Sequence, residues 1–154
     1  EEQVRKGMKE AFWRGRFSVI HKNPVVVIDG AHNPAAAKVL KDSLETYFKG
    51  RDLHFIFGVF ADKDYESVIR MTAPLAKHII TIQTPGNPRA LPAEKLRDAV
   101  RSVNPSVEAA GSIREAVEKS MENIQKDDVI VAFGSLSFLG ELDREVQAME
   151  GEKT

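Results

Sequence analysis

The sequence contains no cysteine among its 154 residues. This absence excludes disulfides, thiolate zinc sites and cysteine nucleophiles, and it suits the reducing cytoplasm in which we expect the protein to reside. No apolar run approaches the roughly 18 residues that a membrane-spanning helix needs, so we expect no membrane partner.

Two phosphate-binding patterns are also missing. The chain has neither the G-x-G-x-x-G pattern of dinucleotide-binding loops nor a G-x-x-x-x-G-K-[ST] P-loop. A nucleotide can contact such a chain, but the usual grip on its triphosphate is absent. The 22 basic and 23 acidic residues give a net charge of −1, and nucleic-acid binding relies on a basic surface, so we expect no nucleic-acid partner.

The chain begins at Glu1 with no initiator methionine, and we expect it to be part of a longer polypeptide. Its 154 residues fit one domain of ordinary size.

Short apolar runs alternate with amphipathic segments along the chain. Four runs are continuous and rich in β-branched residues, which is typical of strands buried on both faces of a parallel sheet. These runs are residues 25–28, 53–57, 78–82 and 128–133, and weaker strands are predicted at 17–20 and 106–109. Because only a few residues separate the first two strands, that pair must be antiparallel.

Helices are predicted between the strands. Asn33, Asp64 and Ser112 are suited to cap helix N-termini, and a last helix is predicted over about residues 138–149. The repeated alternation predicts an α/β fold with an open six-stranded sheet, mostly parallel with one antiparallel N-terminal strand, and helices on both faces.

Polar residues are concentrated in the loops that follow the strands. In open α/β sheets, ligands bind beyond the carboxyl ends of the strands. The loops in question are residues 29–34, 61–64, 84–89 and 134–136. Helix N-termini begin in these loops, and Lys63 and Arg89 add positive charge, so an anion is favoured there. Asp29 can accept hydrogen bonds from ribose hydroxyls or an ammonium group, and His32 can donate to a phosphate or carboxylate.

Structural roles explain several of these residues equally well. Asp29 and His32 are suited to brace the following helix, and Asp62 and Asp64 to form a solvated turn and a helix cap. Ser135 lies in no G-x-S-x-G pattern and has no obvious base beside it. A magnesium or manganese site made of the two loops that hold Asp29, His32, Asp62 and Asp64 is a further alternative, with weak support from the spacing.

Five motifs occur together in a fixed order. They are W-R-G-R-F at 13–17, D-G-A-H-N-P at 29–34, A-D-K-D at 61–64, P-R-A-L-P at 88–92 and F-G-S-L at 133–136. Over about residues 4–146 the chain resembles the C-terminal domain of folylpolyglutamate synthase/dihydrofolate synthase, in the Mur ligase superfamily. The family usually has a proline where Arg14 stands. The resemblance implies a Rossmann-like fold, with a linker helix at 1–15, the domain at 16–150 and a tail at 151–154.

The resemblance also implies a reaction. With ATP as substrate, a folate carboxylate becomes an acyl phosphate, and the amino group of L-glutamate attacks it to form an amide and release phosphate. The family carries its P-loop and Mg²⁺ site in an N-terminal ATPase domain of the same polypeptide. The expected partners are therefore that missing domain, L-glutamate, and folate or dihydropteroate. No metal site is expected in this chain itself.

Residue roles follow from the resemblance position by position. Arg16 matches an arginine that reaches the ATP phosphates, and Asp29 matches an aspartate at the nucleotide ribose. His32 matches a histidine near the γ-phosphate and the incoming glutamate, so it is the candidate catalytic residue. The residues on the glutamate side of the cleft are Asp62, Lys63, Asp64, Arg89 and Ser135.

Three hypotheses are therefore open. The first is a ligase C-terminal domain that is inactive without its N-terminal domain. The second is a stand-alone, non-catalytic module that binds a nucleotide or amino acid and regulates a partner. The third is a small metal-dependent hydrolase.

Overall fold

The computed structural model describes residues 17–153, so the predicted linker helix and Arg16 lie outside the described residues. The strands are β1 (Ser18–Lys22), β2 (Val25–Asp29), β3 (Leu53–Phe57), β4 (Ala76–Thr81), β5 (Val107–Ala109) and β6 (Val129–Phe133). The helices are α2 (Pro34–Tyr47), α3 (Tyr65–Thr72), α4 (Ala93–Arg101), α5 (Ile113–Glu122) and α6 (Leu139–Lys153), and short 3₁₀ turns are η1 (Ala73–Leu75) and η2 (Leu136–Phe138).

The six strands form one sheet in the order β1-β2-β6-β3-β4-β5. β1 pairs antiparallel with β2, and every other neighbouring pair is parallel. The predicted fold class is confirmed, including the single antiparallel strand.

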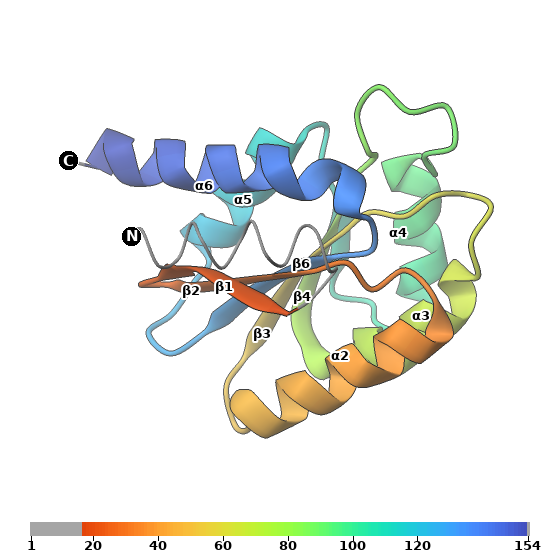
Figure 1. The fold of residues 1–154 in the computed structure, drawn as a ribbon, viewed down its shortest axis with the longest axis horizontal. Coiled ribbons are helices and arrows are strands. Elements are labelled where there is room, and N and C mark those ends of the chain that lie inside the picture. The colour runs from red at the N-terminus through yellow and green to blue at the C-terminus, as the bar shows by residue number, and fades with distance from the viewer. Residues whose placement is uncertain (1–16, 154) are drawn as a thin grey trace.

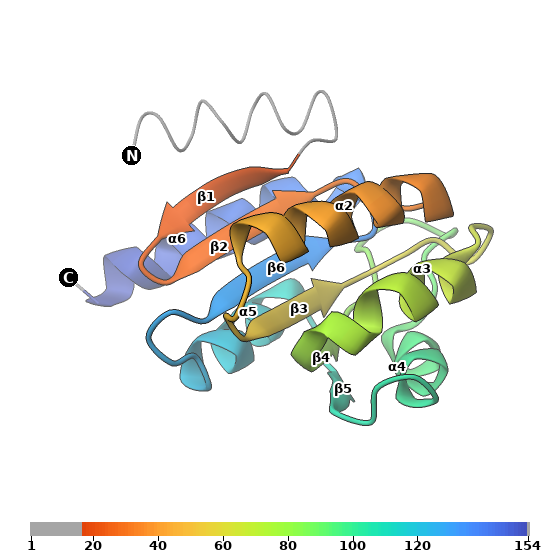
Figure 2. The same cartoon turned by 90° about the horizontal axis from the view of Figure 1, so that it is seen from below.

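Helices cover both faces of the sheet (Figures 1 and 2). Successive residues of a strand point to opposite faces. Val131 therefore packs in the cluster beneath α2, α3 and α4, while its neighbours Ile130 and Ala132 pack in the cluster beneath α5 and α6. Burial on both faces explains why these strands are continuous apolar runs.

Side chains cap the helices where the sequence predicted. Asn33 Oδ1 accepts a hydrogen bond from Ala36 N at 2.8 Å, and Asp64 Oδ1 accepts one from Ser67 N at 3.2 Å. The last helix differs from its prediction, because η2 precedes it and α6 continues past Met149 to Lys153, into the segment assigned to a tail. No helix of residues 17–153 is long and apolar enough to span a membrane.

Two glycines allow β3 and β6 to approach closely where both strands end. Gly134 has φ 114°, and a Cβ built on it would overlap the carbonyl oxygen of Gly58. The Gly58 N–H donates to Phe133 O at 3.3 Å. A side chain at position 134 would push these strand ends apart, so glycine is required there for both its φ and its size.

Candidate functional site

The loops that follow β2, β3, β4 and β6 leave the same edge of the sheet. Asp29 is in register with Phe133, Phe133 with Phe57, and Phe57 with Thr81. The last residues of these strands therefore form one row, and the four polar loops begin side by side. We call this end of the sheet the carboxyl edge.

Asp29 is the last residue of β2 and is buried. Its Oδ1 accepts a hydrogen bond from Ala31 N at 2.8 Å. Burial raises the pKa of this carboxyl to about 6, because an ionised group loses hydration there, and the Ala31 hydrogen bond only partly opposes the rise. A buried carboxylate of this kind gains from a hydroxyl or cationic donor supplied by a ligand.

His32 lies two residues before α2. Its Nδ1 is 2.9 Å from the carbonyl oxygen of Gly30, and because a carbonyl only accepts, Nδ1 carries the hydrogen. No described residue pairs with Nε2. Asn33 caps the helix behind the imidazole and Pro34 is its first residue, so free backbone N–H groups and the positive end of the helix dipole lie next to His32.

Ser135 and Thr84 are buried hydroxyls in two of the neighbouring loops. Ser135 Oγ accepts from Ser137 N at 3.2 Å and lies 2.9 Å from Ser137 Oγ, so it caps η2. Thr84 Oγ1 has no hydrogen-bond partner among the described residues. The sequence placed Thr84 in a site loop, but nothing in it distinguished this hydroxyl from its neighbours.

Asp62 and Arg89 form a bidentate ion pair across two loops. Arg89 Nη2 lies 2.8 Å from Asp62 Oδ2 and 3.1 Å from Oδ1, and Arg89 Nε lies 3.1 Å from Oδ2. The hydrogen bonds from Arg89 hold the pKa of Asp62 below its usual range. Asp62 and Arg89 were predicted as separate substrate-binding residues, and the structure makes each the partner of the other.

Lys63 and Asp64, the two residues directly before α3, have different surroundings. No described residue forms an ion pair with the Lys63 ammonium. Asp64 caps α3, and its hydrogen bonds with Ser67 lower the pKa of the carboxyl. The capping role weighed for Asp64 from the sequence is thus present in the structure.

The acidic residues of these loops do not gather around one point. Among residues 17–153, no three His, Asp or Glu side chains are placed to hold a metal ion. The residues described therefore do not fit the Mg²⁺ that the reaction implies, and they provide no site for the metal-dependent hydrolase hypothesis.

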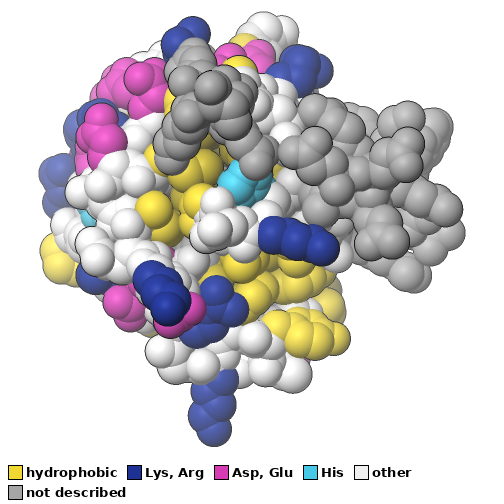
Figure 3. Space-filling view, turned by 90° about the vertical axis from the view of Figure 1, so that its left-hand side faces the viewer, with side chains coloured by type: hydrophobic (Ala, Val, Ile, Leu, Met, Phe, Trp, Pro, Cys, Tyr) yellow, Lys and Arg dark blue, Asp and Glu magenta, His cyan; other side chains and the backbone are white. Residues whose placement is uncertain are grey.

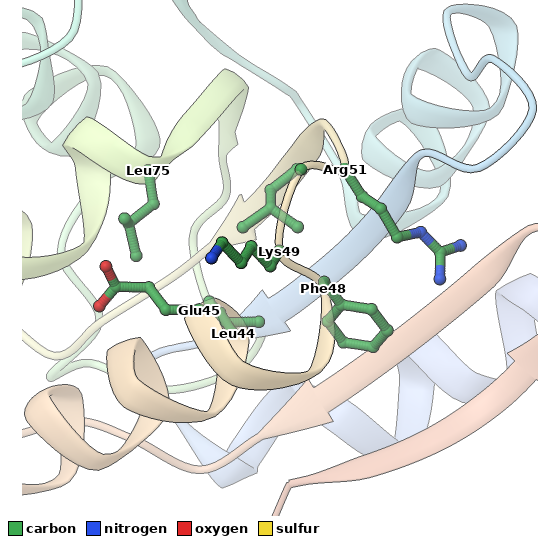
Figure 4. A pocket seen from close by; sticks show the side chains of 8 residues that line it. Leu44, Glu45, Phe48, Lys49, Arg51 and Leu75 are labelled. Carbon is green, nitrogen blue, oxygen red and sulfur yellow. The ribbon is translucent and has the colours of Figure 1, made fainter.

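A distinct hollow of about 410 Å³ lies at the opposite end of the strands. It is lined by Leu44, Glu45, Phe48, Lys49, Gly50, Arg51, Leu53 and Leu75. On this face hydrophobic side chains lie open among Lys and Arg side chains (Figure 3), and Arg51 points away from Glu45 and Leu75 (Figure 4). None of the predicted site residues lines this hollow, so size alone does not mark the functional surface.

Phe60 also contributes to the carboxyl edge, although the sequence did not mark it as a site residue. Its ring lies 4.6 Å from the Arg89 guanidinium carbon. The signal was weak, because an aromatic residue just after an apolar strand is ordinarily part of the core.

The mixed six-stranded sheet with its polar carboxyl edge is an open α/β domain of the type that binds ligands beyond the ends of its strands. The family described as "Mur ligase, glutamate ligase domain" matches residues 15–136, and the chain belongs to that family. It corresponds to the C-terminal domain of folylpolyglutamate/dihydrofolate synthases.

Individual relatives agree with this assignment. Folylpolyglutamate synthase of Lacticaseibacillus casei is 34% identical over 136 residues, covering 88% of this chain and 30% of the relative. A probable bifunctional folylpolyglutamate synthase/dihydropteroate synthase of Haloferax volcanii is 31% identical over 141 residues, covering 91% of this chain and 16% of the relative. The chain thus spans less than a third of either relative.

Solved structures show the same domain. Folylpolyglutamate synthase of Mycobacterium tuberculosis, complexed with ADP, is 28% identical with a TM-score of 0.75, covering 82% of this chain and 31% of that one. Folylpolyglutamate synthase of Thermotoga maritima is 30% identical with a TM-score of 0.74, covering 86% and 30%.

Proposed function

We propose that this chain is the C-terminal part of an ATP-dependent ligase that adds L-glutamate to a folate carboxylate through an acyl phosphate. Its carboxyl edge would form one wall of the active cleft, and an N-terminal ATPase domain of the same polypeptide would form the other. The observation that carries the proposal is the Asp29–Pro34 loop, which joins a buried carboxylate, an imidazole with a free Nε2 and a helix N-terminus on an edge held rigid by the sheet.

Each group has a distinct task in this proposal. Asp29 accepts hydrogen bonds from the nucleotide ribose, and the N–H groups at the start of α2 favour nearby phosphate charge. His32 lies beside the transferred phosphoryl group and the incoming amine. The γ-phosphoryl group passes from ATP to the folate carboxylate, and ADP leaves. The glutamate amine then forms the new C–N bond, the acyl C–O bond to phosphate breaks, and the amine proton passes to the released phosphate. Arg16 would reach the phosphates.

This chain lacks the residue patterns that bind a triphosphate and its metal ion, and this determines which task we assign to each domain. The described residues hold no P-loop and no group of acids or histidines suited to Mg²⁺. Positioning Mg²⁺–triphosphate is the main part of catalysis in phosphoryl transfer, so we assign it to the N-terminal domain. The 154-residue chain, given ATP, Mg²⁺, L-glutamate and a folate, should release no phosphate above buffer. Phosphate release that His32→Ala abolishes would contradict this division.

Nucleotide binding tests the wall assigned to this chain. In ¹⁵N-labelled protein, millimolar ADP should shift the amide resonances of residues 29–33. Asp29→Asn should weaken these shifts, because a neutral amide accepts ribose hydrogen bonds less strongly than a carboxylate. Asp42→Asn, on the exposed side of α2 where Asp42 pairs with Lys38, is the matched control. Shifts confined to other parts of the protein would refute the proposal.

A further inference from the structure

The end of the sheet where β2, β3 and β6 begin, here called the amino end, carries two hollows that the proposed function does not use. The first is the hollow of about 410 Å³, and its apolar wall includes Leu44, Phe48 and Leu75. The second, of about 270 Å³, lies between the β1–β2 turn and the loop before β6. Arg51 lines both, so the hollows adjoin. The first is within the range of roughly 300–1,000 Å³ that is typical of small-molecule sites.

Arg51 is held in place at the boundary between the two hollows. Its Nε donates to Asp127 O at 2.6 Å, and its guanidinium carbon lies 5.3 Å from the Phe48 ring centre. An arginine that stacks on an aromatic ring and donates to a fixed carbonyl has little rotamer freedom left. No described residue accepts a hydrogen bond from its Nη1 or Nη2. These two groups are therefore available to a ligand in a direction that the protein sets.

Three lysines add positive charge on either side of Arg51. Lys49 lines the first hollow, and its side chain extends in the opposite direction from that of Arg51 (Figure 4). Lys22 and Lys126 line the second hollow. None of the three lysines forms an ion pair within residues 17–153. Both hollows thus have ammonium groups at their rims that the fold does not use.

The acids that line the hollows do not cancel this charge. Asp128 is buried, and its Oδ2 accepts from Gln125 N and lies 2.9 Å from His54 Nε2. Glu45 and Asp127 are the other lining acids, and neither carboxylate has a partner in the described part of the chain. Cations outnumber acids around the two hollows, so an anionic group is favoured there over a cationic one.

We propose that the amino end binds a small amphipathic organic anion, with its apolar body against Phe48 and Leu75 and its anionic group at Arg51 and the nearby lysines. An apolar wall alone suits a neutral molecule, and cations alone suit a simple ion. Their meeting at Arg51 favours a ligand that has both parts, and the concave shape favours a small molecule over a protein surface. The inference does not depend on the proposed function, which uses the opposite edge of the sheet.

The test uses two dyes that share an aromatic body and differ in one charged group. They are 8-anilinonaphthalene-1-sulfonate (ANS) and N-phenyl-1-naphthylamine, which has no sulfonate. In the ¹⁵N-labelled chain, ANS should shift the amides of residues 48–53 and 124–127. Raising the salt concentration from roughly 0.1 to 1 M shortens the Debye length from about 10 to 3 Å. The fluorescence titration should then show weaker binding of ANS but not of the neutral dye.

Variants separate the charged contacts from the apolar wall. Lys49→Gln and Lys126→Gln should each weaken ANS binding about threefold, and together about tenfold, with the neutral dye unaffected. Leu75→Ala should weaken the binding of both dyes, because both use the apolar wall. Lys41→Gln is the matched control, since Lys41 carries the same charge on α2 and lines neither hollow.

The outcomes separate this inference from the proposed function. ANS shifts confined to other parts of the chain would overturn the inference, as would ANS binding that the Lys49→Gln/Lys126→Gln double variant leaves unchanged. The ADP-induced shifts of residues 29–33 should persist in that double variant. If ANS behaves as expected while ADP shifts nothing, the proposed function fails and this inference stands. A dispersed spectrum for each variant establishes that it is folded.

Discussion

At the amino-terminal ends of the strands, His54 and Asp128 are buried and bonded to each other, whereas at the carboxyl-terminal ends Asp29 is buried with no side-chain partner among residues 17–153. His54 Nε2 lies 2.9 Å from Asp128 Oδ2, and this oxygen also accepts from Gln125 N at 3.0 Å. Asp29 accepts a hydrogen bond from the backbone N–H of Ala31 at 2.8 Å.

The two buried acids have opposite pKa shifts. Burial raises the pKa of Asp29 to about 6. Burial also acts to raise the pKa of Asp128, but hydrogen bonds from Gln125 and His54 outweigh it, and the pKa lies below its ordinary value. The buried polar groups His54 and Asp128 at the amino end are therefore satisfied by hydrogen bonds within the protein.

Cations at the two ends differ less than the buried acids do. At the amino end, Arg51 Nε donates to Asp127 O at 2.6 Å and Lys77 pairs with Asp52 at 3.4 Å, but Lys49 has no ion-pair partner among the described residues. At the carboxyl edge, Lys63 likewise has none among residues 17–153. The buried acid Asp29, and not the number of unpaired cations, therefore distinguishes the surface that we assign to the nucleotide.

The largest effect is expected where the carboxyl edge is most tightly packed. Gly134→Ala should lower the free energy of unfolding by about 4 kcal/mol, because the new Cβ overlaps Gly58 O at a positive φ. Urea unfolding measures this. Gly50→Ala is the control, since Gly50 also has a positive φ of 79° but open space around it, and about 1 kcal/mol is expected. Equal losses would show that close packing is not the cause.

At the amino end, Asp128→Ala should destabilise the protein by about 3 kcal/mol, because it leaves His54 and Gln125 N without their acceptor in a buried place. The ADP-induced amide shifts of residues 29–33 should persist in the variant. Loss of those shifts with the fold intact would break the division between the amino end and the nucleotide-binding edge.

Asp29 should give the pH dependence of stability an unusual sign. Its pKa is 3.8 in the ordinary state and about 6 when folded, so the folded protein holds the proton more tightly. The contribution of this carboxyl to the free energy of unfolding is fully present below the ordinary pKa of 3.8. It is lost as the pH rises through the folded-state pKa of about 6. The shift corresponds to at most roughly 3 kcal/mol, and we expect about 2 kcal/mol because the carboxyl is not fully enclosed.

Urea unfolding of the protein and Asp29→Asn over this pH range measures the Asp29 contribution. As the pH rises, the unchanged protein should lose free energy of unfolding relative to Asp29→Asn, because asparagine does not titrate. A difference that stays constant would mean that Asp29 is hydrated as in an unfolded chain. The Asp128 carboxyl should contribute in the other direction, with stability lost only as pH falls through its lowered pKa.

The smallest effect is expected at the exposed pair of the amino end. Lys77→Ala should change the free energy of unfolding by less than about 0.5 kcal/mol, because both partners are more than half exposed. It should also leave the ADP-induced shifts unchanged. An altered ligand response would show that the amino end influences the carboxyl edge.

Local patterns in the sequence predicted the elements and their order well. Continuous β-branched runs located β2, β3, β4 and β6, and the side chains of Asn33, Asp64 and Ser112 cap helices as expected. These features depend on interactions between residues a few positions apart, which a sequence displays directly. The end of the last helix was predicted too early, at about residue 149, whereas α6 continues to Lys153. The end of an amphipathic pattern marks where a helix stops packing on the core, and the backbone hydrogen bonds of the helix can continue beyond it.

The pairings across the sheet belong to the tertiary structure. His54 and Asp128 are 74 positions apart, and Asp62 and Arg89 are 27 apart. The sequence alone determined that polar loops follow buried parallel strands, and hence which edge of the sheet they share. Only the folded chain decided which of those polar groups satisfy one another and which are left for a ligand, because that depends on the strand order and on the approach of Gly58 to Gly134.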